Sequence, residues 1–452
     1  MTYIFSLPGE VLCDIFSLII QNSRVFPDVF KTGNTFQDCV SLINLSRVCR
    51  RWREIALSDS SLWSSIFILL DNPAAKTLRQ AAYFADTCLS RSNGLPLTCA
   101  ISLSNLDSLR LARPLILTLI SHEDRWSRIA INFTPSTRPF RSAEIAFPES
   151  EDSDGATGEH DLLLRYAGSS HLKEIHSDLA PWFTYSLHSP LPALSTLRLT
   201  CFTLIGCVYT LANWLPLTPN LQELELTINH NRFVAYGAEP NEQVWKVAER
   251  DVTHRPHFVL PALRTLNIWA PLIPFFTCPA LERYVMEKIL WHAQDLTNYL
   301  EFIERSGNPP SFRSIEIKES DSLLDIAYVH GYLLPTITNL RVISHSNIFF
   351  MLSEQSEEDG VVRFSVLPAL EYLEITDWRD ACLPYFSSLL TSRWDIGVPH
   401  RTLKTVKLKQ HFEASPVPEL LLSPPSDGID LTQVREDWRE IARCVNEGLL
   451  LS

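Results

Sequence analysis

Residues 191–199 read Leu-Pro-Ala-Leu-Ser-Thr-Leu-Arg-Leu, and this stretch decides how most of the chain should fold. Its leucines at 194, 197 and 199 follow the spacing apolar, two variable, apolar, one variable, apolar. Because side chains alternate along a strand, Leu197 and Leu199 should face one side of a short strand. Leu194 should lie in the turn before that strand. One such strand cannot bury its apolar side alone, so further copies of the unit are expected to stack beside it.

The same spacing recurs at irregular intervals along the chain, and it is often preceded by Pro-Ala or Pro-Asn. The first residues of the copies are Trp126, Leu172, Leu194, Leu221, Leu263, Leu281, Phe312, Ile337, Leu370 and Leu403. Leu-Pro-Ala-Leu itself is repeated at 260–263 and 367–370. The pattern resembles a degenerate leucine-rich repeat, which implies parallel strands closed by helices or irregular segments. The alternative is a generic α/β domain whose strands are unrelated.

The first 70 residues carry a helical pattern instead. Pro8 suits the first turn of a helix, where its missing N–H costs nothing. Apolar residues then follow at helical spacing from Val11 to Ile19, and a second apolar series runs from Leu42 to Ala56. So short a segment cannot enclose a large core, so part of this apolar surface should remain exposed for a partner. The alternative is that it packs only against the rest of the chain.

The order Leu7-Pro8, amphipathic helix, Val48-Cys49-Arg50-Arg51-Trp52 helix, Leu62-Trp63 resembles an F-box over residues 5–68. The sequence of this segment is similar to that of F-box proteins of mushroom-forming fungi, including an insertion at 21–38 between the first two helices. This resemblance implies docking to the Skp adaptor of a cullin–RING ubiquitin ligase. The implied adaptor-binding residues are Leu7, Pro8, Val11, Leu12, Ile15, Phe16, Leu42, Leu45, Val48, Cys49, Trp52, Leu62 and Trp63.

Together these patterns predict an α+β chain in which a helical F-box, residues 1–70, precedes an irregular leucine-rich-repeat-like α/β solenoid at 126–415. Residues 71–125 are expected to form a transition, with helices near 74–90 and 106–121 flanking a strand at 97–103. The acidic segments 149–161 and 354–360 are expected to be exposed loops. Residues 416–452 should form a linker and a C-terminal helix from Asp430 to Leu450, with Asp430 and Gln433 at capping-box spacing.

Composition narrows the function. A net charge of −13 disfavours general binding to nucleic acid or anionic membranes. The ten cysteines lie scattered in apolar segments without a CxxC pair, which is typical of free thiols in a reducing compartment. The N-terminus lacks the features of a signal peptide. We therefore expect a cytoplasmic or nuclear protein with no membrane, metal or cofactor.

No nucleophile elbow, zinc-protease motif, P-loop or dinucleotide fingerprint occurs in the sequence, so we expect no enzyme activity. The leading hypothesis is a substrate-recognition subunit of an SCF-type ligase, and the alternative is an F-box scaffold or sensor that acts without ubiquitin transfer. On each strand the residue between the last two apolar positions should face away from the core. These residues, mixed in charge, are the candidate contacts to a protein target: Arg198, Glu225, Asn267, Glu316, Arg341, Glu374 and Lys407. Segment 229–259 is the competing target site.

Overall fold

The computed structural model describes residues 7–22, 41–70, 73–103, 111–133, 171–178, 190–201, 211–212, 214–228, 257–286, 293–318, 333–343, 346–358, 361–378, 380–395, 401–409, 419–422, 428–432 and 434–451. The insertion at 23–38, the acidic segment 149–161 and most of segment 229–259 lie outside the described residues. The chain divides into two compact units, Met1–Pro256 and His257–Ser452, and each is described by itself.

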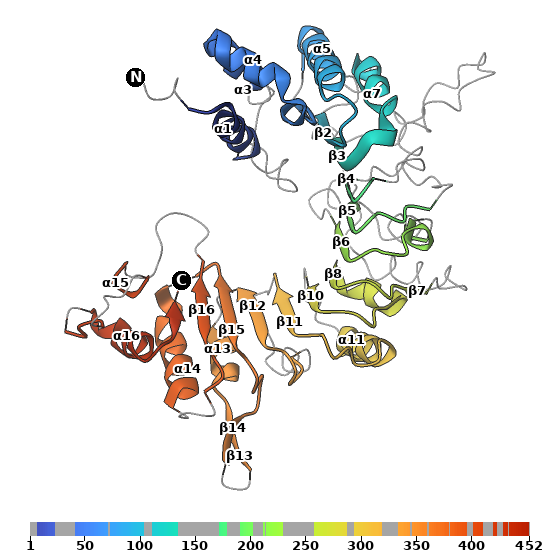
Figure 1. Ribbon diagram of the computed structural model, residues 1–452. Helices are drawn as coiled ribbons and strands as arrows, with labels where there is room; N and C mark the ends of the chain where they lie inside the picture. Colours follow the sequence, from blue (N-terminus) through green and yellow to red (C-terminus); the bar gives the residue numbers. More distant parts are fainter. Residues whose placement is uncertain are drawn as a thin grey trace. The chain divides into compact units, whose positions relative to one another are not determined.

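The first unit opens with helices and continues with alternating strands and helices (Figure 1). Its helices are α1 (Gly9–Asn22), α3 (Ser41–Val48), α4 (Arg50–Ser58), α5 (Ala75–Arg91) and α7 (Arg113–Ile120), with short 3-10 turns η3 (Ser60–Trp63), η4 (Glu123–Arg125) and η8 (Leu215–Leu217). Its strands are β1 (Ser65–Leu70), β2 (Leu97–Leu103), β3 (Trp126–Phe133), β4 (Glu174–Asp178), β5 (Thr196–Cys201) and β6 (Glu223–Ile228).

The second unit has the same mixed character. Its helices are α11 (Ala293–Arg305), α13 (Ser346–Leu352), α14 (Leu383–Asp395), α15 (Glu419–Leu422) and α16 (Arg439–Asn446), with 3-10 turns η10 (Ala270–Phe275), η11 (Asp380–Cys382) and η12 (Glu436–Trp438). Its sheet strands are β8 (Thr265–Ile268), β10 (Arg283–Met286), β11 (Ser314–Ile317), β12 (Asn339–Ile343), β15 (Tyr372–Thr376), β16 (Thr405–Leu408) and β17 (Leu450–Leu451). Two small sheets pair β7 (Phe258–Val259) with β9 (Phe276–Thr277), and β13 (Gln355–Glu358) with β14 (Val361–Phe364).

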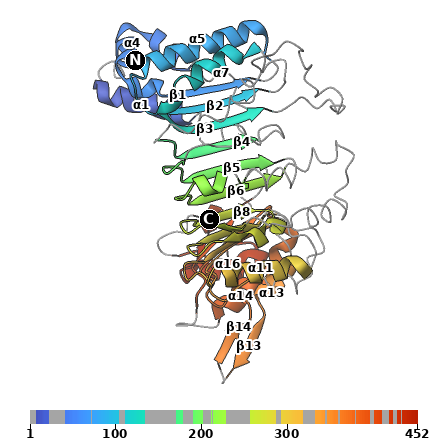
Figure 2. The ribbon, with the colours of Figure 1, turned by 90° about the vertical axis from the view of Figure 1, so that its right-hand side faces the viewer.

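Each unit contains a parallel sheet. Within each sheet a strand pairs with the strand of the same sheet that follows it in the chain. In the first unit the order is β1-β2-β3-β4-β5-β6, which Figure 2 shows side by side. In the second unit the order is β8-β10-β11-β12-β15-β16-β17. The sheet of the first unit begins at Ser65, so it also takes in β1 and β2 ahead of the first repeat copy.

The repeat copies recognised in the sequence align residue for residue across these strands. Leu197 pairs with Leu224 between β5 and β6, and Arg198 pairs with Glu225. In the second unit Glu316 pairs with Arg341, which pairs with Glu374, which pairs with Lys407. The strands predicted from the repeat spacing are therefore confirmed, including the weak copy at Leu281, which forms β10.

A four-residue turn with proline in its second position precedes seven of these strands. In each turn the N–H of the fourth residue donates to the carbonyl of the first, with N···O distances of 3.0–3.3 Å. The fourth residues are Leu194, Leu221, Leu263, Leu281, Phe312, Ile337 and Leu370, and all are buried. Proline fixes the backbone angle that the second position of such a turn requires. The Pro-Ala and Pro-Asn pairs of the sequence therefore set where each strand starts.

The apolar and polar residues of the repeats separate onto opposite faces of the sheet. On β10 the Tyr284 ring stacks on Tyr299 of α11, with ring centres 5.8 Å apart, and also contacts Phe302. Trp378 meets Phe349 of α13 and Phe386 of α14 in a second aromatic cluster. Helices thus line the apolar side, and the charged residues between the apolar positions face the other way.

Some predictions of local structure differ from the structure. Segment 354–360 is not an open loop, because β13 pairs antiparallel with β14, from Gln355 with Phe364 to Glu358 with Val361. Asp-Gly between two strands is a typical two-residue hairpin turn. Within the expected linker, residues 419–422 form α15.

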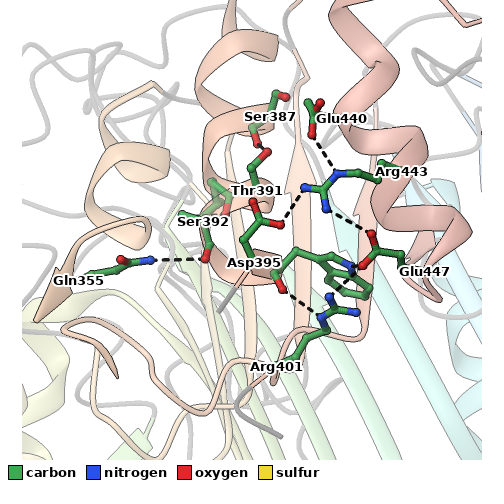
Figure 3. A network of polar contacts seen from close by, with 11 residues as sticks. Gln355, Ser387, Thr391, Ser392, Asp395, Arg401, Glu440, Arg443 and Glu447 are labelled. Carbon is green, nitrogen blue, oxygen red and sulfur yellow. Dashed lines mark hydrogen bonds and ion pairs between the residues drawn. The ribbon is translucent and has the colours of Figure 1, made fainter. Parts of the chain in front are cut away.

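The C-terminal helix is shorter than expected. It covers only Arg439–Asn446, because Asp430 caps a local turn by accepting from the Thr432 N–H at 2.9 Å instead of starting a helix. Gly448 has a positive φ of 110°, which ends the helix, and Leu450–Leu451 then pair with β16. Arg443 of α16 binds Asp395 of α14 at 2.8 Å and also contacts Glu440 and Glu447 (Figure 3).

Candidate functional site

The helices at the start of the first unit pack around one pair of aromatic rings. Leu12 and Phe16 share the inner face of α1 and are fully buried. The Phe16 ring meets the edge of Trp52 from α4, with ring centres 5.0 Å apart. Phe16 and Trp52, two of the expected adaptor contacts, are therefore buried, because short helices of this length use their largest side chains to hold one another.

The end of this segment is also core. Trp63 is completely buried, its indole N–H donates to the Ala56 carbonyl at 2.6 Å, and the Arg91 guanidinium lies 4.3 Å from the ring centre. Leu42 and Leu62 are buried as well. Six of the expected adaptor contacts therefore support the surface from within: Leu12, Phe16, Leu42, Trp52, Leu62 and Trp63.

The exposed apolar residues of α1 form a stripe beside the buried face that carries Leu12 and Phe16. Val11 and Leu18 expose 39% and 56% of their surface, and Ile15 between them is half-buried. The three positions are four and three residues apart, so they lie on one face of the helix. We call Val11, Ile15 and Leu18 the α1 stripe. Sequence reasoning missed Leu18, although the helical spacing from Val11 and Ile15 would have identified it.

Other expected contacts are also accessible. Pro8 is exposed, and Leu7, Leu45 and Cys49 are half-buried. Val48, at the end of α3, exposes 56% of its surface. Leu57 on α4 exposes 42% and was not among the predicted contacts.

The expected Val-Cys-Arg-Arg-Trp helix is two helices. Cys49 adopts extended backbone between α3 and α4, and its Sγ accepts from the Trp52 N–H at 3.4 Å, which caps the second helix. The Arg51 guanidinium donates to the Leu7 carbonyl and so ties the chain ahead of α1 to α4. The break therefore orders the same surface that carries Val48.

A second candidate site is the polar face of the sheet in the second unit. Charged side chains alternate in sign across its neighbouring strands. Arg341 on β12 binds Glu316 of β11 at 3.1 Å and Glu374 of β15 at 2.8 Å, and Lys409 after β16 binds Glu374 at 2.7 Å. Arg283 of β10 binds Glu316 from the other side. We call these five residues, Arg283, Glu316, Arg341, Glu374 and Lys409, the charge ladder.

The ladder keeps the Glu374 carboxylate ionised. Burial raises the pKa of Glu374, but hydrogen bonds from Arg341, Lys409 and Tyr372 outweigh it and bring the pKa down to about 2. Burial and the bond to Glu374 raise the pKa of Tyr372 to about 12, so the phenol stays protonated and donates at 2.8 Å. Glu374 is therefore ionised throughout the physiological pH range.

The polar face of the first unit holds a smaller cluster. Glu174 of β4 contacts Arg128 and His176, both at 3.3 Å, and Arg198 of β5 contacts Glu223 and Glu225 at 3.4 Å and 3.2 Å. Burial raises the pKa of Glu174, but His176, Arg128 and Arg198 lower it overall. This cluster contains more carboxylates than guanidinium groups.

The predicted target contacts thus fall into two groups. Arg198 and Glu225 lie side by side in the first unit, whereas Asn267, Glu316, Arg341, Glu374 and Lys407 share one register row in the second. Asn267, Glu316 and Glu374 are buried, contrary to a simple exposed column. Neighbouring side chains on the adjacent strands cover them, which the alternation of one strand does not reveal.

Within the part of the chain that the structure describes, no three histidine, cysteine, aspartate or glutamate side chains are grouped as a metal site. Among the same residues, no helix has the length and apolar character needed to cross a bilayer.

Comparison with known proteins identifies the N-terminal segment. Residues 4–69 match the F-box-like family, and domains of this type generally bind Skp adaptors. The matched range spans α1, α3, α4 and η3 and ends within β1. A search of curated proteins found no significant match to the chain.

Proposed function

We propose that this chain is a substrate-recognition subunit of an SCF-type cullin–RING ubiquitin ligase. In this role residues 4–69 bind the Skp adaptor and through it the cullin, and the sheet-bearing remainder binds a protein target. The observation that carries the proposal is the exposed α1 stripe inside the F-box-like segment. Exposed apolar side chains on a helix otherwise held by a closed core are typical of a protein contact surface.

The proposed target-binding region is a degenerate leucine-rich-repeat solenoid, similar to those of fungal F-box proteins. The recurring proline turns and the residue-for-residue strand register support this. The protein would act as an adapter without catalysis or cofactor, because the partner subunits carry out ubiquitin transfer. Its proposed location is the cytoplasm or the nucleus. The target is a protein, and neither nucleic acid nor a membrane is a proposed partner.

Co-purification of the full chain with the Skp adaptor tests the docking step. Val11→Asp with Leu18→Asp places two carboxylates in the α1 stripe and should weaken adaptor affinity more than tenfold, because a buried interface cannot hold unpaired charge. Tyr83→Asp on α5 is the matched control, since this ring exposes 74% of its surface but lies outside the F-box-like segment. Equal adaptor binding by all three proteins would refute docking through this stripe.

Transfer of ubiquitin separates the two hypotheses for the whole protein. The reconstituted complex should modify proteins that co-purify with the wild-type chain, and the stripe variant should not support this modification. Adaptor binding without modification of any captured protein would favour the alternative of a scaffold or sensor.

A further inference from the structure

The charge ladder presents its positive and negative members differently to solvent. The Arg283, Arg341 and Lys409 side chains expose 42%, 32% and 46% of their surface. The Glu316 and Glu374 side chains expose 9% and 3%. The carboxylates therefore lie between the cations and hold them in place, while the cations reach the surface.

The charge ladder together with Lys407 carries more positive than negative charge, within a chain whose net charge is negative. Across β10 to β16 its described side chains include the ladder cations and Lys407, which lies two residues before Lys409 on the same face. Four cations stand against two carboxylates, whereas the full chain has a net charge of −13. Charge of one sign gathered on one face attracts a ligand of the opposite sign.

The spacing of the cations fits an extended polypeptide. They occur on β10, β12 and β16, with one carboxylate-bearing strand between each pair. Neighbouring strands are about 4.8 Å apart, so successive cations recur at about 10 Å across the sheet. A chain in the extended polyproline II conformation has three residues per turn and rises about 3.1 Å per residue, so carboxylates placed three residues apart lie on one face at about 9 Å, close to this interval. The net negative charge of the whole chain opposes the approach of a long polyanion such as nucleic acid.

We propose that the polar face of β10, β11, β12, β15 and β16 binds an acidic peptide segment of the target protein, rich in aspartate and glutamate. This inference rests on the proposed function, because it names the class of target that the receptor would select. Glu316, Glu374 and Tyr372 act as positioning residues that hold the cations, and Arg283, Arg341, Lys407 and Lys409 contact the ligand.

The test uses the full chain and a fluorescein-labelled peptide of glutamates separated by glycine pairs, with binding followed by fluorescence anisotropy. The wild-type chain should bind this peptide, more weakly as salt rises, and should not bind the same peptide with glutamine in place of glutamate. Arg283→Ser with Lys407→Ser should weaken binding about tenfold, because each charge contributes a modest part of the attraction. Arg313→Ser with Lys404→Ser is the matched control, since both residues are exposed in the same unit and precede their strands.

A variant with increased affinity shows that changes in peptide binding do not result from misfolding. Asn339 is exposed, begins β12 and lies on the polar face two residues before Arg341. Asn339→Lys should tighten peptide binding about threefold, which an unfolded variant could not do.

Equal affinity of the wild type and of R283S/K407S would overturn the inference and leave the ladder a stabilising device only. Tighter binding of a single-stranded oligonucleotide than of the glutamate peptide would also overturn it. Adaptor co-purification is measured on the same preparations. If it persists while peptide binding fails, the target assignment alone is wrong, and if it fails, the proposed function is wrong.

Discussion

At the scale of single residues, Glu374 shows how a carboxylate is accommodated with 2% of its surface exposed. A buried charge is costly unless opposite charges and hydrogen bonds surround it. Arg341, Lys409 and Tyr372 supply three such partners within 2.7–2.8 Å. Removing one of these side chains leaves the other charges buried without their full set of partners. A single substitution therefore lowers the unfolding free energy by more than one contact contributes.

The depressed pKa of Glu374 predicts how acid affects stability. A carboxyl with a folded pKa of about 2 contributes stability that is fully present above its unfolded pKa of about 4.3. That contribution falls as the pH drops from about 4.3 towards 2. Glu374→Gln should therefore lose about 2 kcal/mol of unfolding free energy at pH 7, and its deficit should shrink at pH 3. Urea unfolding at both pH values measures this. A deficit that does not change with pH would contradict the assigned pKa.

Alternation along a strand correctly predicted that Glu374 and its row face away from the apolar layer. It could not predict their burial, because that depends on the size and charge of residues on two neighbouring strands. Arg283 and Lys409, which complete the ladder, lie outside the residue position that the repeat pattern selected. They become visible only when the register of adjacent strands is known.

At the scale of elements, the end of the described chain illustrates competition between helix and strand. The sequence predicted one helix over residues 430–450, but Gly448 ends α16 and the next residues extend the sheet. Trp394 of α14 donates its indole N–H to Glu447 at 2.9 Å, and Arg401 binds the same carboxylate at 2.9 Å. Side chains from three segments therefore fix where α16 stops.

Two adjacent leucines test this arrangement. Leu449 is 1% exposed, whereas Leu450 exposes 65% of its surface. Leu449→Ala should lower the unfolding free energy by about 2–4 kcal/mol, because it leaves a cavity between α16 and the sheet. Leu450→Ala is the matched control and should change it by less than about 0.5 kcal/mol. Equal effects in thermal or urea unfolding would show that β17 does not hold the position described.

Helices and strands were predictable where apolar spacing and composition indicated the same element. They were missed where a single turn or cap residue determined the structure. The strand expected at 97–103 is β2, and the helix expected at 74–90 differs from α5 by one residue at each end. The pairing of β13 with β14 was missed because the acidic composition of 354–360 was given more weight than the Asp-Gly pair in its sequence. The separation of α3 from α4 was missed because Cys49 is a rare helix cap.

At the scale of the whole molecule, the repeat spacing predicted the parallel arrangement of the strands in both units. It did not predict the division at Pro256 or the start of the first sheet at Ser65. Neither feature has a signature in the apolar spacing, because β1 and β2 lack the Leu-x-x-Leu-x-Leu pattern. At the candidate adaptor surface, the sequence predicted the first helix, but several residues expected to contact the adaptor are buried in the core. Phe16 and Trp52 look like contact residues only until their partners are known.

Cysteines distributed over the molecule give a test of the proposed lack of catalysis. Burial raises the pKa of Cys99 to about 12, raises that of Cys278, and raises that of Cys444 to about 11. Because the thiolate is the reactive form, these residues should react with iodoacetamide at pH 8 only after unfolding. Half-buried Cys49 should react earlier in the native protein. Mass spectrometric mapping of the modified peptides checks this order, and rapid native labelling of Cys99 would count against a passive thiol.

The recurring proline turn has a consequence for engineering. Each turn fixes the first residue of its strand, so the register of the sheet does not depend on the length of the segment that leads to the turn. Among the copies that follow such a turn, the first residues are 18 residues apart between Leu263 and Leu281 and 42 apart between Leu221 and Leu263. Lengthening a connection costs little closure entropy. Foreign sequence grafted after one strand and before the next proline turn should therefore be tolerated, making these connections natural insertion points for a designed recognition loop.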